Sequence, residues 1–215
     1  MNPFPVILSS PSGGGKTTIA MKLLEARDDV GYSVSCTTRA PREGEREGRD
    51  YYFRSRESFE QGRQRGEFAE SAEVHGQLYG TLRSEVERVI SEGRHVVMDI
   101  DVQGAKQFMT AFPHSVLIFI LPPSAEVMIG RLKARGSEDN KSLVRRLKSA
   151  KEELKAVDFY QYVIVNDRIE AAVSAVSSIV EAEEYRRTRA GGLSARLADL
   201  MGGVERAIDH HSKGQ

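Results

Sequence analysis

The chain has 215 residues, one cysteine, and no excess charge of either sign. Because Cys36 has no second cysteine to pair with, an internal disulfide is excluded, which suits a reducing compartment. Lysine and arginine together number 31, as do aspartate and glutamate, so no overall positive charge draws the chain to nucleic acid or to a membrane. No stretch is long and apolar enough to span a bilayer, and the first residues lack the pattern of a signal peptide. We therefore expect a cytoplasmic protein with no nucleic-acid or membrane partner.

The sequence does have enough apolar residues, 40% of the total, for one domain with a sizeable core. Short runs rich in β-branched residues recur along it, and helical patterns lie between most of them. The runs are 6–8, 32–34, 96–100, 116–121 and 162–165. This alternation predicts an α/β fold with a doubly wound parallel sheet. Ser84 and Glu87 have the spacing of a capping box, which predicts a helix start there.

The clearest motif follows the first apolar run and reads Ser-Pro-Ser-Gly-Gly-Gly-Lys-Thr over residues 10–17. It fits the phosphate-binding loop (P-loop) G-x-x-x-x-G-K-S/T, except that Ser10 stands at the first glycine position. Backbone N–H groups and the following helix N-terminus bind phosphate in such loops, while the threonine hydroxyl ligates Mg²⁺. A flexible glycine-rich loop is the alternative, but the flanking strand and helix patterns are the context that the motif requires. The predicted ATP-binding residues here are Ser12, Gly13, Gly14, Gly15, Lys16, Thr17 and Thr18.

A carboxylate ends the apolar run at 96–99. Because the carboxyl ends of parallel strands form the ligand crevice, we expect Asp99 to face the magnesium ion held by Thr17. The alternative is that Asp99 caps the helix expected over 102–111, since aspartate is favoured at that position.

Two regions interrupt the alternation of strands and helices. Residues 35–83 contain few long apolar runs and predict a small, mostly β insertion. Residues 126–151 are dense in lysine and arginine and predict a mobile helical lid. The expected division is a core with the P-loop at 1–34, the insertion at 35–83, core at 84–125, the lid at 126–151, core at 152–190 and a tail at 191–215.

Two arginines flank a proline at residues 39–42. Arginine suits forked recognition of phosphate, and the P-loop already accommodates one nucleotide, so Arg39 and Arg42 indicate a second anion, the acceptor substrate. Two solvated surface arginines are the alternative.

The chain resembles the guanylate kinases from about residue 4 to residue 186. The motifs that carry the resemblance lie at 12–17, 35–42, 50–53, 79–80, 99–104, 120–123 and 163–167. The resemblance implies a P-loop kinase of purine nucleotide metabolism with a core, a small GMP-binding region and a lid. Such a kinase transfers the γ-phosphoryl group of ATP to GMP and gives ADP and GDP.

The resemblance also assigns roles to particular positions. Those matching the contacts to the GMP phosphate are Arg39, Arg42, Tyr51 and Tyr79. Those matching the surroundings of guanine are Ser35, Glu70, Thr81 and Asp101. The lid arginines that approach the ATP phosphates match Arg135 and Arg146, and the contact near adenine matches Asn166. Catalytic charge is then expected from Lys16, Arg42, Arg135 and Arg146, together with Mg²⁺ bound to Thr17 and Asp99.

The assignment of Glu70 to guanine also follows from its chemistry. Guanine presents two adjacent donors, a ring N–H and an amino group, to which one carboxylate accepts in parallel, whereas adenine has a ring acceptor that repels it. A buried hydrogen-bonding group rejects a ligand that leaves it unpaired. Taken alone, Glu70 fits an exposed acid on an edge strand equally well.

Further interpretations remain open. One is an inactive guanylate-kinase-like module that binds phosphorylated peptides, and another is a related kinase with a different phosphorylated acceptor. For the guanylate kinase itself, use of dGMP beside GMP is also open. The basic lid also fits a solvated face or an RNA-binding stripe, although it has no interleaved aromatics for base stacking. The apolar face of residues 193–201 fits either a homo-oligomer contact or packing on the chain's own core.

Overall fold

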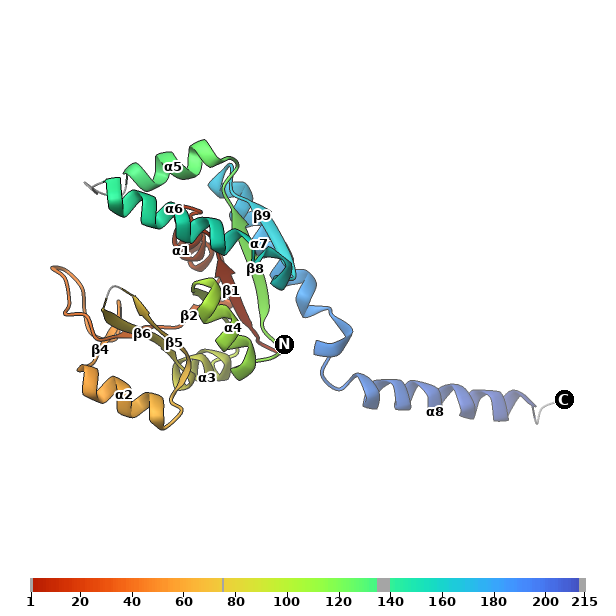
Figure 1. Cartoon of the computed structure of the whole chain (residues 1–215). Coiled ribbons are helices and arrows are strands. Elements are labelled where there is room, and N and C mark those ends of the chain that lie inside the picture. The colour runs from red at the N-terminus through yellow and green to blue at the C-terminus, as the bar shows by residue number, and fades with distance from the viewer. Residues whose placement is uncertain (1, 75, 135–139, 213–215) are drawn as a thin grey trace.

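A five-stranded parallel sheet forms the centre of the computed structural model, which describes residues 2–74, 76–134 and 140–212 (Figure 1). Its strand order is β2-β7-β1-β8-β9. The strands are β1 (Pro5–Ser9), β2 (Val30–Tyr32), β7 (His95–Asp99), β8 (Val116–Leu121) and β9 (Tyr162–Val165). Four of the five apolar runs coincide with strands, while the run at 32–34 overlaps β2 only at Tyr32. The predicted α/β fold with a parallel sheet is confirmed.

Helices cover both faces of this sheet. The helices on one face are α1 (Lys16–Ala26) and α7 (Ile169–Glu184), and those on the other are α3 (Arg83–Ser91) and α4 (Val102–Ala111). Because side chains alternate along a strand, Val6 and Leu8 of β1 pack against α1 and α7, while Ile7 packs on the face of α3 and α4. Each of these three side chains is fully buried, which contributes about 1.5–3 kcal/mol apiece.

The direction in which successive strands are added to the sheet reverses at β1. From β1 the chain runs through α1 to β2, beyond β7, whereas from β7 it runs through α4 to β8, on the other side of β1. Ligands bind in α/β sheets at the carboxyl ends of the strands where the strand order reverses in this way. The fold therefore places a crevice beyond Ser9 and Asp99.

A second, four-stranded sheet forms most of residues 35–83. Its order is β4-β3-β6-β5, and only β3 and β4 pair in parallel among its neighbours. The elements are β3 (Ser35–Thr37), β4 (Tyr52–Phe53), α2 (Arg56–Gln64), β5 (Phe68–Val74) and β6 (Gln77–Leu82). Phe59 of α2 stacks on Phe68 with ring centroids 4.3 Å apart, so this sheet has a small core of its own with Cys36 inside it.

Two helices follow β8 and form a hairpin with its own apolar contacts. They are α5 (Ala125–Ala134) and α6 (Asn140–Leu154), joined through residues 135–139. Ser124 caps α5 by accepting from the N–H of Val127 at 3.3 Å. Met128 and Leu132 of α5 pack against Ala150 of α6, so the two helices support each other.

The predicted helix start at Ser84 is wrong. Strand β6 runs directly into α3, which begins at Arg83 after Leu82 and has no side-chain cap. Ser84 therefore lies inside the first turn and its hydroxyl does not occupy the cap position.

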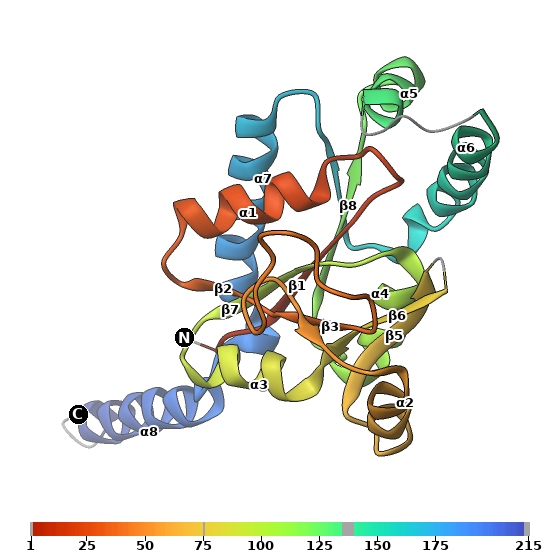
Figure 2. The same ribbon diagram turned by 90° about the vertical axis from the view of Figure 1, so that its left-hand side faces the viewer.

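The last helix, α8 (Leu193–Ser212), projects away from the rest of the molecule (Figures 1 and 2). Among the described residues, two short 3₁₀ turns occur in the C-terminal part of the chain. η1 (Val157–Phe159) precedes β9, and η2 (Arg187–Arg189) lies between α7 and α8. None of the residues of α8 is buried. Within the described ranges, no helix combines the length and apolarity needed to cross a bilayer.

Candidate active site

The loop between β1 and α1 has the geometry of a phosphate-binding loop. Gly13 and Gly15 have φ angles of 87° and 92°, in the left-handed region that favours glycine. A Cβ on Gly14 would lie 2.5 Å from the Cβ of Ser10. The serine at the first glycine position is therefore accommodated because Gly14 has no side chain. The loop ends at Lys16, where α1 begins and directs its free N–H groups toward the loop.

Asn166, the residue after β9, supports this loop by a hydrogen bond to its backbone. Its Nδ2 donates to the carbonyl of Gly14 at 2.8 Å, and a Cβ on Gly15 would lie 2.4 Å from the same nitrogen. The side chain is buried, at 3% exposure. This contact fixes the loop, while a role of Asn166 near adenine stays a prediction.

Asp99 lies beside the first turn of α1. Its carboxylate accepts from the Thr17 hydroxyl at 2.5 Å and from the Tyr32 hydroxyl at 2.8 Å. Burial and the nearby Asp99 raise the pKa of Tyr32, so Tyr32 stays a donor. The alternative role of Asp99 as a helix cap is wrong, because Asp101 caps α4 and accepts from Gly104 N–H at 2.7 Å. Hydroxyl and carboxylate oxygens are the ligands that Mg²⁺ prefers, so Thr17 and Asp99 fit this ion.

A cavity of about 470 Å³ adjoins the other side of the loop. Its lining includes Gly13, Gly15, Thr18, Arg131, Asn166 and Asp167. Arg131 donates from Nη2 to the carbonyl of Asn166 at 3.2 Å, whereas its Nη1 is buried without a hydrogen-bond acceptor among the described residues. An anion in this cavity would supply that acceptor. Arg131 lies in the lysine- and arginine-rich segment 126–151, and the sequence alone predicts no role for it.

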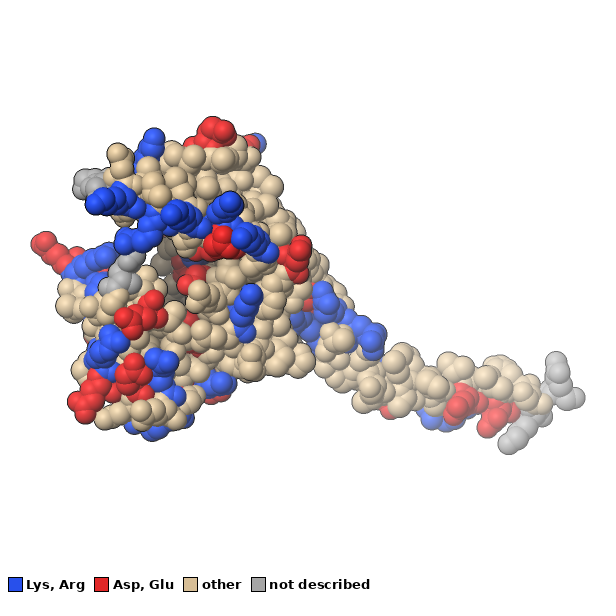
Figure 3. Space-filling view, in the orientation of Figure 1, with Lys and Arg blue, Asp and Glu red and all other residues tan. Residues whose placement is uncertain are grey.

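The lid helix α6 reaches the phosphate loop at its C-terminal end. The backbone N–H of Ser12 donates to Oε2 of Glu153 at 3.2 Å. Arg146, half-buried, precedes Glu153 by two helical turns and so lies on the same face of α6. Lysine and arginine side chains gather along α6 above a hollow in the surface (Figure 3). Arg135 lies outside the described residues.

A row of polar side chains crosses three strands of the small sheet. Ser35 on β3 pairs with Thr81 on β6, which pairs with Glu70 on β5. The Thr81 hydroxyl donates to Oε1 of Glu70 at 2.7 Å, and Glu70 is only 8% exposed. A Cβ on Gly104 of α4 would lie 2.9 Å from Oε2, so the helix leaves room for this carboxylate.

The environment of Glu70 favours its neutral form when no ligand is bound. Burial, with the negative charge of Asp101 added to it, raises the pKa of Glu70 to about 7, although the Thr81 hydrogen bond acts in the opposite direction. A partner with two hydrogen-bond donors would stabilise the carboxylate and restore its ionisation. The site is therefore suited to a ligand that donates to both oxygens.

The arginine and tyrosine side chains assigned to the acceptor phosphate lie together at one end of the same sheet. The Arg39 guanidinium lies 5.3 Å from the centre of the Tyr51 ring, and Tyr51 meets Tyr79 edge to face at 6.1 Å. Glu45 holds this group by accepting from Arg39 Nη2 and from the N–H of Arg42, each at 2.8 Å. The side chain of Arg42 is exposed.

The two groups of residues lie at the same end of the parallel sheet. Burial, Tyr79 and then the negative charge of Asp99 raise the pKa of Tyr51, so Tyr51 lies close enough to Asp99 to interact with its charge. Glu70 in turn lies close to Asp101, two residues after Asp99. The structure therefore brings together Ser12, Gly13, Gly14, Gly15, Lys16, Thr17, Thr18, Asp99, Asn166, Ser35, Arg39, Tyr51, Glu70, Tyr79, Thr81 and Asp101 around one crevice.

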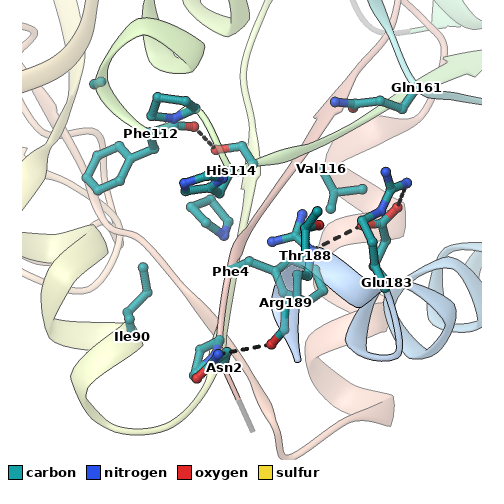
Figure 4. A pocket seen from close by; sticks show the side chains of 16 residues that line it. Asn2, Phe4, Ile90, Phe112, His114, Val116, Gln161, Glu183, Thr188 and Arg189 are labelled. Carbon is teal, nitrogen blue, oxygen red and sulfur yellow. Dashed lines mark hydrogen bonds and ion pairs between the residues drawn. The ribbon is translucent and has the colours of Figure 1, made fainter. Parts of the chain in front are cut away.

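A separate cavity, also about 470 Å³, lies at the amino-terminal end of the sheet (Figure 4). There Glu183, 2% exposed, accepts from Arg189 Nε at 3.1 Å, and Arg189 lies over the Phe4 ring at 4.1 Å. The Asn2 side chain donates to the Arg189 carbonyl at 3.0 Å. These contacts attach the segment before α8 to the sheet, far from the P-loop.

Comparison with known proteins agrees with this geometry. A family model described as guanylate kinase matches residues 2–183. A guanylate kinase from Nitrosomonas europaea is 44% identical over 85% of this chain and 91% of its own length, and one from Thermotoga maritima is 46% identical over 85% and 88%. The crystal structure of guanylate kinase from Anaplasma phagocytophilum superposes with a TM-score of 0.74 at 39% identity, covering 92% of this chain and 94% of that one. The chain therefore belongs to the guanylate kinase family.

Proposed function

We propose that the chain transfers the γ-phosphoryl group of ATP to GMP and releases ADP and GDP. The observation that supports this most directly is the buried Glu70 carboxylate, aligned with Ser35 and Thr81, at the same end of the sheet as the phosphate loop. Guanine offers two parallel N–H donors to such a carboxylate, while adenine places an acceptor there. The acceptor base would thus be selected by hydrogen bonding.

The phosphate of GMP would bind to Arg39, Arg42, Tyr51 and Tyr79. Arg39 and the Arg42 backbone are held by Glu45 in the structure, so the loop that carries them is already ordered by an anion. A bound phosphate would attract the same guanidinium groups through charge-assisted hydrogen bonds. In this way residues 35–83 would act as the GMP-binding region.

The ATP phosphates would lie on the N–H groups of residues 13–18, next to Ser12, whose own N–H is bonded to Glu153, with Lys16 reaching the outer phosphates and Asn166 holding the loop in shape. Thr17 and Asp99 would hold Mg²⁺, which supplies positive charge to the phosphate oxygens when it is bound. During transfer, an oxygen of the GMP phosphate bonds to the γ-phosphorus, and the bond from the γ-phosphorus to the oxygen bridging it to the β-phosphate breaks.

Catalysis by these residues would come from alignment and charge. Phosphoryl transfer requires little covalent participation by the protein, so cations around the migrating group carry most of the effect. Lys16, Arg42 and Arg146 would supply this charge, as would Arg135, which lies outside the described residues. Residues 126–151 would act as a lid that closes with the GMP-binding region and excludes water, a competing acceptor.

A comparison of acceptors tests the proposal. With ATP and Mg²⁺, the chain should form ADP rapidly with GMP as acceptor. The rate with dGMP should be equal to or below the rate with GMP, and the rates with AMP, CMP and UMP should be far lower. Equal turnover with AMP and GMP would contradict the role of Glu70. A folded chain that leaves ATP intact with every nucleoside monophosphate would contradict the proposed reaction and support the phosphopeptide-binding alternative.

Replacing a lid arginine tests the catalytic assignment. Arg146→Ala should lower kcat on the order of 10³-fold, since arginines that act on the transition state have effects of that size. A rise in the KM for ATP with kcat intact would show that Arg146 contributes to binding alone.

A further inference from the structure

A carboxylate from the lid helix contacts the backbone of the phosphate loop. Oε2 of Glu153 accepts from the N–H of Ser12 at 3.2 Å, and Oε1 accepts from the Ser149 hydroxyl at 3.1 Å. Ser149 lies one turn earlier on the same helix, so both carboxylate oxygens are held in place. This fixes the half-buried Glu153 side chain in one orientation.

This contact is electrostatically unfavourable for a loop that binds phosphate. Backbone N–H groups of such a loop bind anions, and a fixed carboxylate beside them repels the phosphates of ATP. Affinity for ATP therefore gives no reason for an acid at residue 153. Another residue of the same helix supplies a reason.

Helix α6 also carries Arg146, seven residues before Glu153. Two helical turns separate them, so both side chains lie on one face, about 10 Å apart along the axis. Toward its middle the helix packs on α5 through Ala150, which contacts the cluster of Met128 and Leu132. The Glu153 contact attaches the C-terminal end of α6 to Ser12 and thus sets the distance from Arg146 to the loop.

We propose that Glu153 is a positioning residue, which tethers α6 to the phosphate loop and thereby places Arg146 over the transferring phosphoryl group. This rests on the proposed kinase function. The tether acts through Arg146 and does not touch substrate. The lid helix then turns about a fixed point at the loop, and Arg146 travels along a defined path when the lid closes.

Steady-state kinetics of the full chain with ATP, GMP and Mg²⁺ tests this proposal. Glu153→Ala should lower kcat about 10- to 100-fold, as expected for a misplacement of a catalytic group by about 1 Å, while the KM for ATP should not rise and should fall if the lost carboxylate repelled the phosphates. Glu153→Gln keeps an oxygen that accepts from Ser12 and should retain most of the activity. The matched control is Glu152→Ala, since Glu152 is exposed, pairs with Lys155 at 2.7 Å and should be replaceable without effect.

A double variant separates the tether from a general effect on folding. If Glu153 acts through Arg146, Glu153→Ala should have no further effect on kcat in an Arg146→Ala background. Additive losses in the double variant would overturn the tether, as would a Glu153→Ala change confined to the KM for ATP. Glu153→Gln activity as low as that of Glu153→Ala would also overturn it. A wild-type chain that shows no GMP-dependent turnover would contradict the proposed function itself. The outcomes above concern only the variants of an active chain, so failure of the tether and failure of the proposed function are distinguishable.

Discussion

Replacing Glu70 with glutamine is expected to stabilise the fold and weaken recognition of GMP. Burial raises the pKa of Glu70 to about 7 from a usual value of 4.5. Between these pH values the folded chain keeps a proton that the unfolded chain loses, so the free energy of unfolding falls as the pH rises from 4.5 to 7. Because one pKa unit corresponds to about 1.4 kcal/mol, the ionised carboxylate lowers the free energy of unfolding by about 3 kcal/mol above pH 7.

Glutamine has the same size and no charge, and its carbonyl oxygen accepts from the Thr81 hydroxyl as the carboxylate does. Glu70→Gln should therefore match the wild-type stability near pH 4.5 and exceed it by about 3 kcal/mol at pH 8. For a chain of this length, that difference raises Tm by about 6–12 °C. Urea unfolding without nucleotide, from pH 4.5 to 8.5, measures it. Glu152→Gln serves as the exposed control.

The same substitution should impair catalysis with GMP. The amide offers one acceptor and places its own donor opposite a donor of guanine, so kcat/KM should fall about 100-fold or more, at about 1.5–3 kcal/mol per hydrogen bond to a charged group. In the wild type, the KM for GMP should rise as the pH falls below 7, because protonation removes one acceptor. A stability difference between the two proteins that does not change with pH would refute the reasoning about the buried charge.

Three other changes have expected outcomes. Asp99→Asn should raise the Mg²⁺ concentration required for half-maximal activity about 10- to 100-fold, measured by titrating Mg²⁺ at fixed ATP, and an unchanged requirement would remove Asp99 from the metal site. Gly14→Ala should cost about 1–3 kcal/mol in ATP binding through its contact with Ser10. Adding Ser10→Gly should restore much of that affinity in calorimetry, and no restoration would show that the two residues do not clash. Truncation after Ala190 removes α8 and should leave kcat unchanged. If the exposed apolar side chains of α8, such as Met201 at 62% exposure, mediate self-association, only the full chain should associate in sedimentation, and identical sedimentation would argue against a homo-oligomer through α8.

Sequence patterns predicted most of the central sheet because four of its five strands contain a run of three or more apolar residues. They also located Asp99, since a carboxylate at the end of a buried parallel strand lies at the carboxyl edge of the sheet. The second half of α8 was missed. Gly202 and Gly203 are poor helix formers, yet the apolar spacing continues through Val204 and Ile208.

The row around Glu70 could not be derived from pattern alone. Ser35, Glu70 and Thr81 become neighbours only through the register of three strands, which no local signal specifies. The resemblance to a family supplied their roles instead. Glu153 and Arg131 were missed for a related reason, because their contacts depend on how α5 and α6 pack over the loop.

The attachment of the last helix has a practical consequence. Contacts of Asn2 and Arg189 hold the N-terminal residues and the segment before α8 on the side of the sheet opposite the crevice, and α8 continues away from that side. A purification tag or a surface linker joined beyond α8 would leave the nucleotide entrance open (Figure 1). Immobilised enzyme could then report nucleotide binding directly on a biosensor chip, with the lid and the small sheet facing the solution.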